Sequence, residues 1–443
     1  MKVLLTGATG YIGKRILPEL IKNGHDVVCC VRDIDRFNPP ESLRKNIKII
    51  EVDLLKKESL INIPTDIDIA YYLVHSMSST KDYGKIELES AHNFRNYLSD
   101  TNCKQLIYLS GIVNTDNLSE HLTSRLGVEN ELSKGSYHLT TLRAGIIIGS
   151  GSASFEIIRD LVEKLPIMVT PKWLNTKCQP IAVADALTYL LKSLGNEKTY
   201  DKSFDIGGPD ILTYKEMLLQ YARVRKLKRK IFIVPVMTPK LSSYWLYFVT
   251  STSYKLASAL VDSMKVEVVC RNSDINDIIK NKDLTYTQAL ERAFSKIESH
   301  RIASSWKDSF SSSELDLNVS DFINVPTYGC FTDHKVSNFK NDKELINNLW
   351  SIGGEKGYFY ASWLWQIRGI IDKFFGGVGL RRGRTNQDKI TTGDSIDFWR
   401  VLYANKDEGR LLLFAEMKLP GDAWLEFKIK NDEFYQTATF RPK

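Results

Sequence analysis

Hydrophobic residues over the first 207 positions form short apolar runs that alternate with longer segments of helical periodicity. Most of these runs are apolar at consecutive positions, as expected for strands that are covered on both faces. The alternation predicts an α/β fold in which crossover helices connect the strands of a parallel sheet. The predicted strands are 2–5, 26–31, 47–52, 67–73, 105–109, 138–142 and 203–206, and the predicted helices are 12–23, 81–99, 120–133, 153–164 and 183–194.

The alternation weakens after residue 207. Two capping boxes, with Thr213 before Glu216 and Thr285 before Gln288, predict the starts of two further helices. Between them, residues 244–264 are expected to form an amphipathic or buried helix, and a serine-rich stretch at 301–320 is typical of a linker. We therefore expect a large domain at 1–300, with a substrate-binding extension at about 207–300, and a second domain at 321–443.

The second domain has a different pattern, with six of the eight tryptophans lying beyond residue 300. Runs of strand length at 395–404, 410–418 and 423–430 are separated by turn residues, and an aromatic helix is predicted at 358–375. This pattern indicates an antiparallel sheet with one or two helices, which is a separate α+β domain.

The composition is that of a folded protein, because 43% of the 443 residues are hydrophobic and 26% are charged. A net charge of +7 is too mild and too evenly spread to indicate nucleic acid as a partner. The six cysteines form no CxxC pair, so we expect reduced, buried thiols and no metal site. No signal peptide or integral membrane segment can be drawn, so a cytoplasmic location is expected. Peripheral membrane contact and the oligomeric state stay open.

The segment TGATGYIG at 6–13 follows the first predicted strand and begins the first predicted helix. There Gly7 permits a tight turn, Gly10 lets the backbone approach a pyrophosphate, and Gly13 lets the helix pack close to the strand. The motif therefore predicts a Rossmann-type doubly wound parallel sheet that binds a nicotinamide dinucleotide. The cofactor-binding residues expected in this loop are Thr6, Gly7, Thr9, Gly10, Tyr11, Ile12 and Gly13.

The end of the second predicted strand indicates which dinucleotide binds. Arg32 leaves this strand first and can pair with a 2′-phosphate, which favours NADP, while Asp33 keeps NAD open as a partner for the ribose hydroxyl. After the third strand, Asp53 and Leu54 are expected at the cofactor, although a plain helix N-cap is the alternative for Asp53. His75 ends the fourth strand and is either a cofactor contact or a hydrogen-bonded loop histidine.

These segments resemble the short-chain dehydrogenase/reductase superfamily, through the loop at 6–13, the VDL at 52–54 and the strand that ends in Leu109 and Ser110. A closer likeness is to its atypical, NmrA-like NAD(P)-binding members. This likeness rests on YLVHSM at 72–77, LRAG at 142–145, SGSASF at 150–155 and QPIAVAD at 179–185.

The carboxy-terminal part resembles a domain of unknown function that is related to START-like, helix-grip proteins. Its segments GGVGLRRGR at 376–384, DFWR at 397–400 and AEMKLPG at 415–421 carry this likeness. The resemblance implies a carboxy-terminal α+β helix-grip-like domain, and the helix that closes such a fold would be truncated from this sequence.

Typical members of the superfamily reduce carbonyls with a serine, a tyrosine and a lysine four residues after the tyrosine. Ser110 matches the serine, but where the other two should fall this chain has His121 and Arg125, which share one helix face. Histidine can exchange a proton near neutrality, and arginine can hold ribose hydroxyls but keeps its own proton. We expect Ser110, His121 and Arg125 to be the catalytic set, with a purely structural role for His121 as the alternative.

Other arginines allow two interpretations. Arg143, after the next strand, binds either a substrate anion or an acidic neighbour. In the glycine-rich segment, Arg381, Arg382 and Arg384 form either a clamp for a phosphate or carboxylate, or a turn with solvated arginines. The tryptophans of the same domain either line an apolar cavity or fill a core.

The sequence favours an oxidoreductase that uses NADPH to reduce a small-molecule substrate, a small apolar carbonyl or enone held between the two domains. The missing tyrosine and lysine keep open a non-catalytic sensor of NADP(H). A lipid or quinone carrier built around the carboxy-terminal domain is the third hypothesis.

Overall fold

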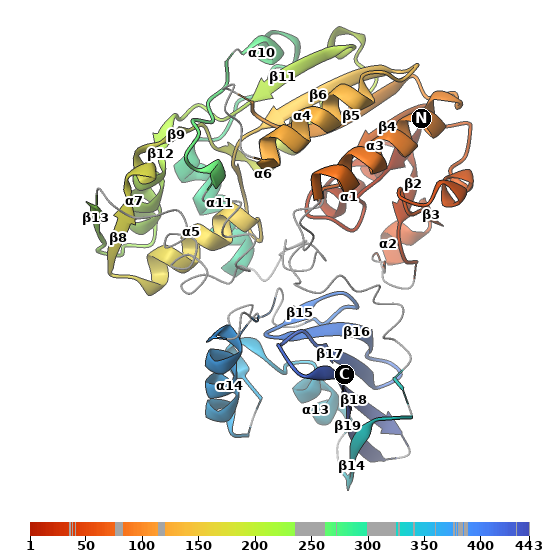
Figure 1. The fold of residues 1–443 in the computed structure, drawn as a ribbon, viewed down its shortest axis with the longest axis vertical. Helices are drawn as coiled ribbons and strands as arrows, with labels where there is room; N and C mark the ends of the chain where they lie inside the picture. The colour runs from red at the N-terminus through yellow and green to blue at the C-terminus, as the bar shows by residue number, and fades with distance from the viewer. Residues whose placement is uncertain are drawn as a thin grey trace.

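The computed structural model of the chain contains a seven-stranded and a six-stranded sheet, each in its own half of the molecule (Figure 1). The predicted linker at 301–320 lies outside the described residues. The structure describes the whole chain except residues 35–36, 38, 40, 76–82, 114–119, 235–261, 272, 299–324, 327, 340–341, 359, 375–376, 378, 380–383, 385–388, 431 and 443.

The seven-stranded sheet confirms the predicted doubly wound architecture. Its strand order is β11-β6-β5-β4-β1-β2-β3, and every neighbouring pair is parallel. The order reverses between β1 and β4, and this switch point is where ligands bind in open α/β sheets. The strands are β1 (Lys2–Leu5), β2 (Asp26–Val31), β3 (Ile47–Glu51), β4 (Ile69–Tyr72), β5 (Gln105–Gly111), β6 (His138–Ala144) and β11 (Lys202–Ile206).

Helices cover both faces of this sheet, because alternate strand residues point to opposite sides and both sets are apolar. On one face, α1 (Gly13–Lys22) and α6 (Val183–Ser193) pack on the sheet through residues such as Leu17 and Leu190. On the other face, α3 (Tyr83–Ser99) and α4 (Glu120–Leu132) do so through residues such as Phe94 and Leu132. The short helices α2 (Glu41–Arg44) and α10 (Asp274–Ile278) lie at the edges.

A smaller subdomain lies next to the carboxyl ends of the strands. Both capping boxes are confirmed: the Glu216 amide donates to Thr213 at 3.2 Å, and the Thr285 amide donates to Gln288 at 3.0 Å. The predicted helix at 244–264 lies almost entirely outside the described residues. The elements of the subdomain are α5 (Ala153–Lys164), α7 (Tyr214–Val224), α11 (Tyr286–Glu298), β7 (Ile147–Ile148), β8 (Ile167–Pro171), β9 (Lys177–Cys178), β10 (Ile181–Ala182), β12 (Leu212–Thr213) and β13 (Lys230–Val234).

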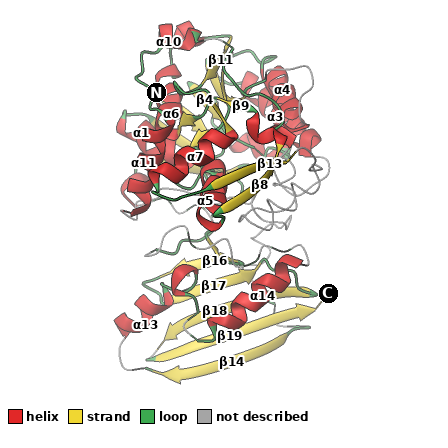
Figure 2. Cartoon of the chain, turned by 90° about the vertical axis from the view of Figure 1, so that its left-hand side faces the viewer, coloured by secondary structure: helices red, strands yellow, loops and turns green. Residues whose placement is uncertain are grey.

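The carboxy-terminal half confirms the predicted α+β domain, since two helices lie over one antiparallel sheet of order β14-β19-β18-β17-β16-β15 (Figure 2). The predicted strand at 395–404 is wrong in one respect, because Asp397 has a φ of 53° and turns the chain between two strands. The elements are β14 (Phe331–Asn338), α13 (Asp342–Leu349), α14 (Ser362–Phe374), β15 (Ser395–Ile396), β16 (Trp399–Asn405), β17 (Arg410–Ala415), β18 (Gly421–Lys430) and β19 (Glu433–Pro442).

The aromatic residues of this domain mainly fill its core. Trp350, Trp399 and Trp424 are all buried, and Trp365 stacks among Tyr358 and other rings. The six cysteines of the chain are free thiols, four of them buried. Within the described residues, none of the helices has the length and hydropathy that crossing a membrane requires.

Candidate functional site

The loop between β1 and α1 has the shape that a pyrophosphate site needs. Gly7 has a φ of +70°, and a Cβ atom there would lie 2.5 Å from the Leu73 carbonyl oxygen. A Cβ atom on Gly13 would lie 2.1 Å from the Gly7 oxygen, so the helix start packs directly on the turn. The first turn of α1 carries no acidic residue, which leaves the positive end of the helix dipole for an anion. The loop therefore fits a dinucleotide.

Two side chains at the start of α1 tie this loop to the subdomain. The Tyr11 hydroxyl and the Arg15 guanidinium both donate to the Ser150 carbonyl oxygen, at 3.3 and 2.6 Å, just before α5 begins. Arg15 also stacks over the Tyr11 ring at 4.6 Å. Burial raises the pKa of Tyr11 to about 12, so this phenol stays protonated as a donor. No local sequence pattern predicts this contact, because 139 residues separate Tyr11 from Ser150.

The other predicted cofactor residues differ in their surroundings. The Thr6 hydroxyl is buried and donates to the Tyr71 carbonyl at 2.8 Å, while Thr9 and Arg32 are exposed. Asp53 accepts from the Leu55 amide at 3.2 Å in a local turn, and it is not the N-cap considered as its alternative, because the N-cap of the next helix, Lys57–Asn62, is Lys56. Leu54 is 8% exposed and packs in the core between the sheet and α3.

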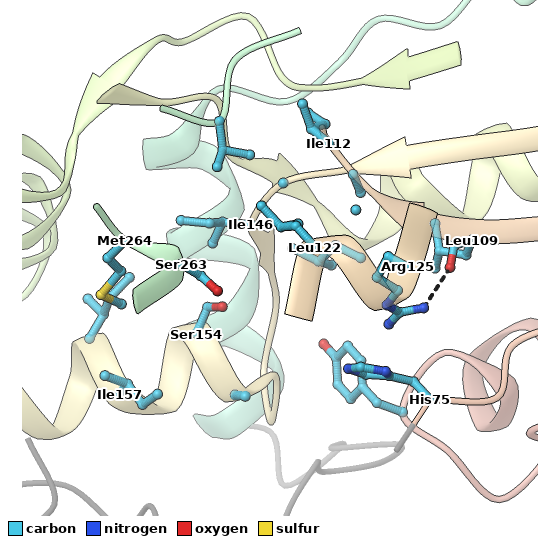
Figure 3. Close-up of a pocket in the computed structure, with 18 of the residues that line it drawn as sticks. His75, Leu109, Ile112, Leu122, Arg125, Ile146, Ser154, Ile157, Ser263 and Met264 are labelled. Carbon is cyan, nitrogen blue, oxygen red and sulfur yellow. Dashed lines mark hydrogen bonds between the residues drawn. The ribbon is translucent and has the colours of Figure 1, made fainter. Parts of the chain in front are cut away.

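A cavity of about 400 Å³ begins at the loop and runs along the carboxyl ends of the strands into the subdomain (Figure 3). Its volume lies in the range typical of small-molecule sites. Gly10, Gly13, His75, Ser110 and Arg125 line the end next to the loop. Apolar side chains line the far end, among them Ile157, Ile158, Leu161, Trp173, Met217, Leu218 and Met264.

Ser110 and Arg125 of the predicted catalytic set therefore meet at one cavity. Ser110 is 5% exposed, and its hydroxyl has no hydrogen-bond partner among the described residues. Arg125 donates to the Leu109 carbonyl at 3.2 Å, as Figure 3 shows, and its Nε is buried without a partner in the described part of the chain. His121 lies in the first turn of α4, but its side chain is outside the described residues.

His75 is held by an acidic residue that sequence reasoning did not find. His75 Nδ1 and Glu87 Oε1 are 2.7 Å apart, and the Ser124 hydroxyl donates to the other oxygen of Glu87 at 2.5 Å. Burial, together with the charge of Arg125, lowers the pKa of His75 to about 4. Burial alone would raise the pKa of Glu87, but the bonds from His75 and Ser124 and the charge of Arg125 lower it to about 2. At neutral pH the cavity thus holds a neutral imidazole that is oriented by a carboxylate.

Polar groups are sparse at the subdomain end of the cavity. Figure 3 shows the hydroxyls of Ser154 and Ser263 pointing toward one another there, between Ile146, Ile157 and Met264. No spacing in the sequence predicts that these two serines lie close together, because α5 and the residues near 263 meet only through packing of the subdomain. A ligand at this end therefore meets mostly apolar walls with two hydroxyls.

The two ambiguous arginine sites have internal partners. Arg143 forms a bidentate pair with Glu129 at 2.6 and 3.1 Å, which is the acidic neighbour of the two alternatives. Arg384 donates to the carbonyls of Trp350 and Ile352 at 2.8 and 3.1 Å. Asp372 accepts from the Gly379 amide at 2.8 Å, so the described part of the glycine-rich segment is bound within its own domain. Arg381 and Arg382 lie outside the described residues.

Comparison with known proteins agrees with this geometry. Residues 3–116, which contain the glycine loop and Ser110, match the model of the NAD dependent epimerase/dehydratase family. The resemblance of this domain to the short-chain dehydrogenase/reductase superfamily is confirmed. Residues 330–443 match the model of a protein family of unknown function, DUF2867.

Curated relatives of the amino-terminal domain are distant. A divinyl chlorophyllide a 8-vinyl-reductase of Arabidopsis thaliana is 26% identical over 227 residues, which are 47% of this chain and 54% of the relative. The chain thus spans about half the length of that relative. A photosystem II assembly factor of Trieres chinensis is 23% identical over 255 residues, 55% of this chain and 75% of that protein. The triphenylmethane reductase of Citrobacter sp. shares the fold, with a TM-score of 0.54 and 15% identity, over 67% of this chain and all of that structure.

Proposed function

We propose that this chain is an NADPH-dependent reductase of an apolar carbonyl or enone. The observation that carries the proposal is the continuous cavity that joins Gly10 and Gly13 of the nucleotide loop to Ser110 and then to the apolar subdomain. A dehydrogenase site needs a dinucleotide, a polar group at the reacting oxygen and a water-poor chamber for the substrate. This cavity brings residues suited to all three needs together.

The proposed roles follow from position. When bound, the dinucleotide supplies the hydride. The Ser110 hydroxyl, which has no partner in the described part of the chain, donates a hydrogen bond to the substrate oxygen. Arg125 holds the ribose hydroxyls, and His121 supplies the proton that the substrate oxygen takes up when the hydride reaches the carbonyl carbon. His75, fixed by Glu87, accepts a hydrogen bond from the cofactor or the substrate.

The choice of NADPH over NADH rests on Arg32. This side chain is exposed at the end of β2, the strand next to β1, where the adenosine ribose lies in Rossmann-type sites. A guanidinium can pair with the 2′-phosphate through two parallel hydrogen bonds. Asp33 is the group that would favour NAD instead.

The substrate class rests on the walls of the chamber. The large apolar side chains that line its far end favour a ligand with a broad apolar surface. The reductases among the compared proteins are named for a divinyl chlorophyllide and for triphenylmethane dyes, and both names describe unsaturated compounds. An apolar conjugated acceptor of hydride is the class that agrees with both observations.

The test is a two-step assay on the purified chain. Fluorescence titration with NADPH and NADH should give tighter binding of NADPH, and Arg32→Ala should remove the difference while leaving NADH binding unchanged. NADPH oxidation is then measured against a panel of aldehydes, quinones, enones and triphenylmethane dyes. Oxidation with at least one apolar acceptor is expected, and failure to bind either dinucleotide would overturn the proposal.

A second candidate function is a non-catalytic NADP(H) sensor. The observation in its favour is that Arg125 occupies the place of the superfamily lysine and cannot share its proton. The similarity over 255 residues to a protein named as an assembly factor, and not as an enzyme, also supports this candidate. Tight NADPH binding without turnover of any acceptor in the panel would favour this candidate.

A further inference from the structure

Helix α14 of the carboxy-terminal domain is apolar on two opposite sides. Its inner side packs on the sheet, where the Trp365 ring lies 5.5 Å from that of Phe398 and 6.3 Å from that of Trp399, and Gly369 and Asp372 are buried. The outer side carries five large apolar side chains with exposed fractions of 44 to 61%. They are Trp363, Leu364, Ile367, Ile370 and Ile371.

These five side chains form one surface, which we call the α14 face. Residues three, four and seven positions apart share one side of a helix, so Trp363, Ile367 and Ile370 line up, with Leu364 and Ile371 beside them. Figure 2 shows α14 lying across the sheet on the outer side of the domain. Tyr360, two residues before the helix, is 87% exposed and adds a second aromatic ring near its start.

The α14 face differs from other exposed apolar residues of the described chain. Ile61 and Ile211 are 78% and 53% exposed, but each is a single exposed side chain, which soluble proteins tolerate without a partner, and Ile167, Val169 and Phe232 on the paired strands β8 and β13 form a smaller group of three. A contiguous stripe of five on one helix is the pattern of a surface that is covered in use.

The charges beside the α14 face have one sign at the surface. Lys356 before the helix and Lys418 beside it are exposed, and Arg368 on the helix is partly exposed while its guanidinium donates to the Lys418 carbonyl at 2.9 Å. The carboxylates of Asp372 and Asp397 are 1% and 4% exposed and accept hydrogen bonds within the domain. Lys356, Arg368 and Lys418 therefore place positive charge near the stripe, and Arg368 also pairs with the buried Asp372 at 3.7 Å.

We infer that the α14 face lies in the interface of an anionic lipid bilayer. Tryptophan and tyrosine favour the boundary between headgroups and acyl chains, and aliphatic side chains between them enter the acyl region. Lysine and arginine at the rim bind anionic headgroups. Pairing with a second copy of the chain would instead bring like charges together around the stripe. This inference goes beyond the proposed function and does not depend on it.

Vesicle co-sedimentation of the full chain tests the inference. The chain should bind vesicles of mixed phosphatidylglycerol and phosphatidylcholine more tightly than vesicles of phosphatidylcholine alone, and added salt should weaken the binding. Ile367→Gln combined with Ile370→Gln should lower the partition coefficient at least about tenfold, because each isoleucine loses its apolar transfer energy. The matched control, Ile61→Gln combined with Ile211→Gln, should leave it unchanged.

Two further readouts keep the test decisive. The tryptophan emission should shift to shorter wavelength on binding, and Trp363→Phe should remove most of that shift while the protein still sediments with the vesicles. Equal binding of the Ile367/Ile370 variant and the control would overturn the inference, as would absence of binding to both vesicle types. A dimer in light scattering that the Ile367/Ile370 variant loses would show that a second copy covers the face and would also overturn it.

Discussion

Each domain buries nitrogen atoms of an arginine, but the two arginines differ in their hydrogen bonds. In the amino-terminal domain, the Arg125 Nε and the Ser110 hydroxyl are buried next to a cavity without partners among the described residues. In the carboxy-terminal domain, the buried guanidinium of Arg400 pairs with Glu416 at 2.9 Å and donates to the Gly393 carbonyl at 2.8 Å. Because unsatisfied buried polar groups are costly, the first arrangement indicates a ligand site and the second indicates structural support.

Glycine motifs show the same contrast. Gly7 and Gly13 shape a turn whose helix end stays open to an anion, whereas Gly377 and Gly379 donate their amides to Asp372 inside their own domain. The DFWR motif is also structural, since Phe398 and Trp399 lie in the core and Arg400 is the buried ion-pair partner. A glycine- or arginine-rich motif therefore indicates a ligand only where the fold leaves its donors unused.

The largest effect is expected from Gly13→Ala. Its Cβ atom would meet the Gly7 oxygen at 2.1 Å, so the loop must open and dinucleotide binding should be lost in fluorescence titration. The same change at Gly127, in α4, meets no atom within 4 Å and should stabilise the helix by about 1 kcal/mol. Retained binding in Gly13→Ala would contradict the phosphate-loop assignment.

In the carboxy-terminal domain, Arg400→Met should cost about 3–5 kcal/mol of stability, because it leaves Glu416 charged and buried without its partner. Arg410→Met breaks a pair with Glu426 in which the arginine is 35% exposed, and should cost less than about 1 kcal/mol. Urea unfolding measures both. Neither variant should change NADPH affinity. A changed affinity in Arg400→Met alone would show that this buried ion pair has more than a structural role.

The amino-terminal domain should lose stability when the pH falls from about 6.5 to 4. The pKa of His75 is lowered to about 4 in the folded protein, so between pH 6.5 and 4 the unfolded chain binds more protons than the folded one. The free energy of unfolding therefore decreases as the pH is lowered. The loss from this group is at most about 3 kcal/mol, since 21% of the side chain stays exposed. His75→Gln should remove that part of the pH dependence in urea unfolding, whereas His25→Gln should remove little. Equal slopes in both variants would show that His75 is not the group responsible.

Ser110→Ala should lower turnover of an accepted substrate by about 10- to 100-fold and leave the free energy of unfolding within about 1 kcal/mol. Thr141→Val is the matched control, because its hydroxyl is equally buried and lacks a partner in the described chain but does not line the cavity. Steady-state rates with NADPH separate the two variants. Similar rates would show that an unpartnered buried hydroxyl does not by itself mark the site.

The smallest effect is expected from Thr213→Ala in the subdomain, at about 1 kcal/mol, because the variant loses the cap of α7. Thr188→Ala removes only a bond to the Ala184 carbonyl inside α6 and should be closer to neutral. Thermal unfolding compares them. An unchanged midpoint for Thr213→Ala would mean that packing alone holds this helix.

Local rules predicted most of the fold of the amino-terminal domain. The strands 2–5 and 26–31 have the predicted bounds because they are continuous apolar runs between turn residues. In the carboxy-terminal domain β14 was missed, since all eight of its residues are exposed and show no apolar alternation. The turn at Asp397 was missed because a positive φ at an aspartate leaves no distinctive sequence pattern.

The site was predictable only where its geometry is local. The glycine loop is fixed by residues within eight positions, so its motif predicts its shape. The pairing of His75 with Glu87 depends on how α3 packs beside β4, and the apolar chamber on how α5 and α7 meet the sheet. These contacts join residues that no spacing rule relates. The role of His121 stays a prediction.

The shared anchor of Tyr11 and Arg15 on the Ser150 carbonyl has a kinetic consequence. Tyr11 and Arg15 both bind the carbonyl oxygen of Ser150, which lies two residues before the N-cap of α5, and Ile157 and Ile158 of α5 line the cavity. We expect a movement of the loop around a pyrophosphate to shift this wall, which the second reactant must touch. We expect a compulsory order of addition, dinucleotide first, visible as product inhibition by NADP that is competitive with NADPH alone.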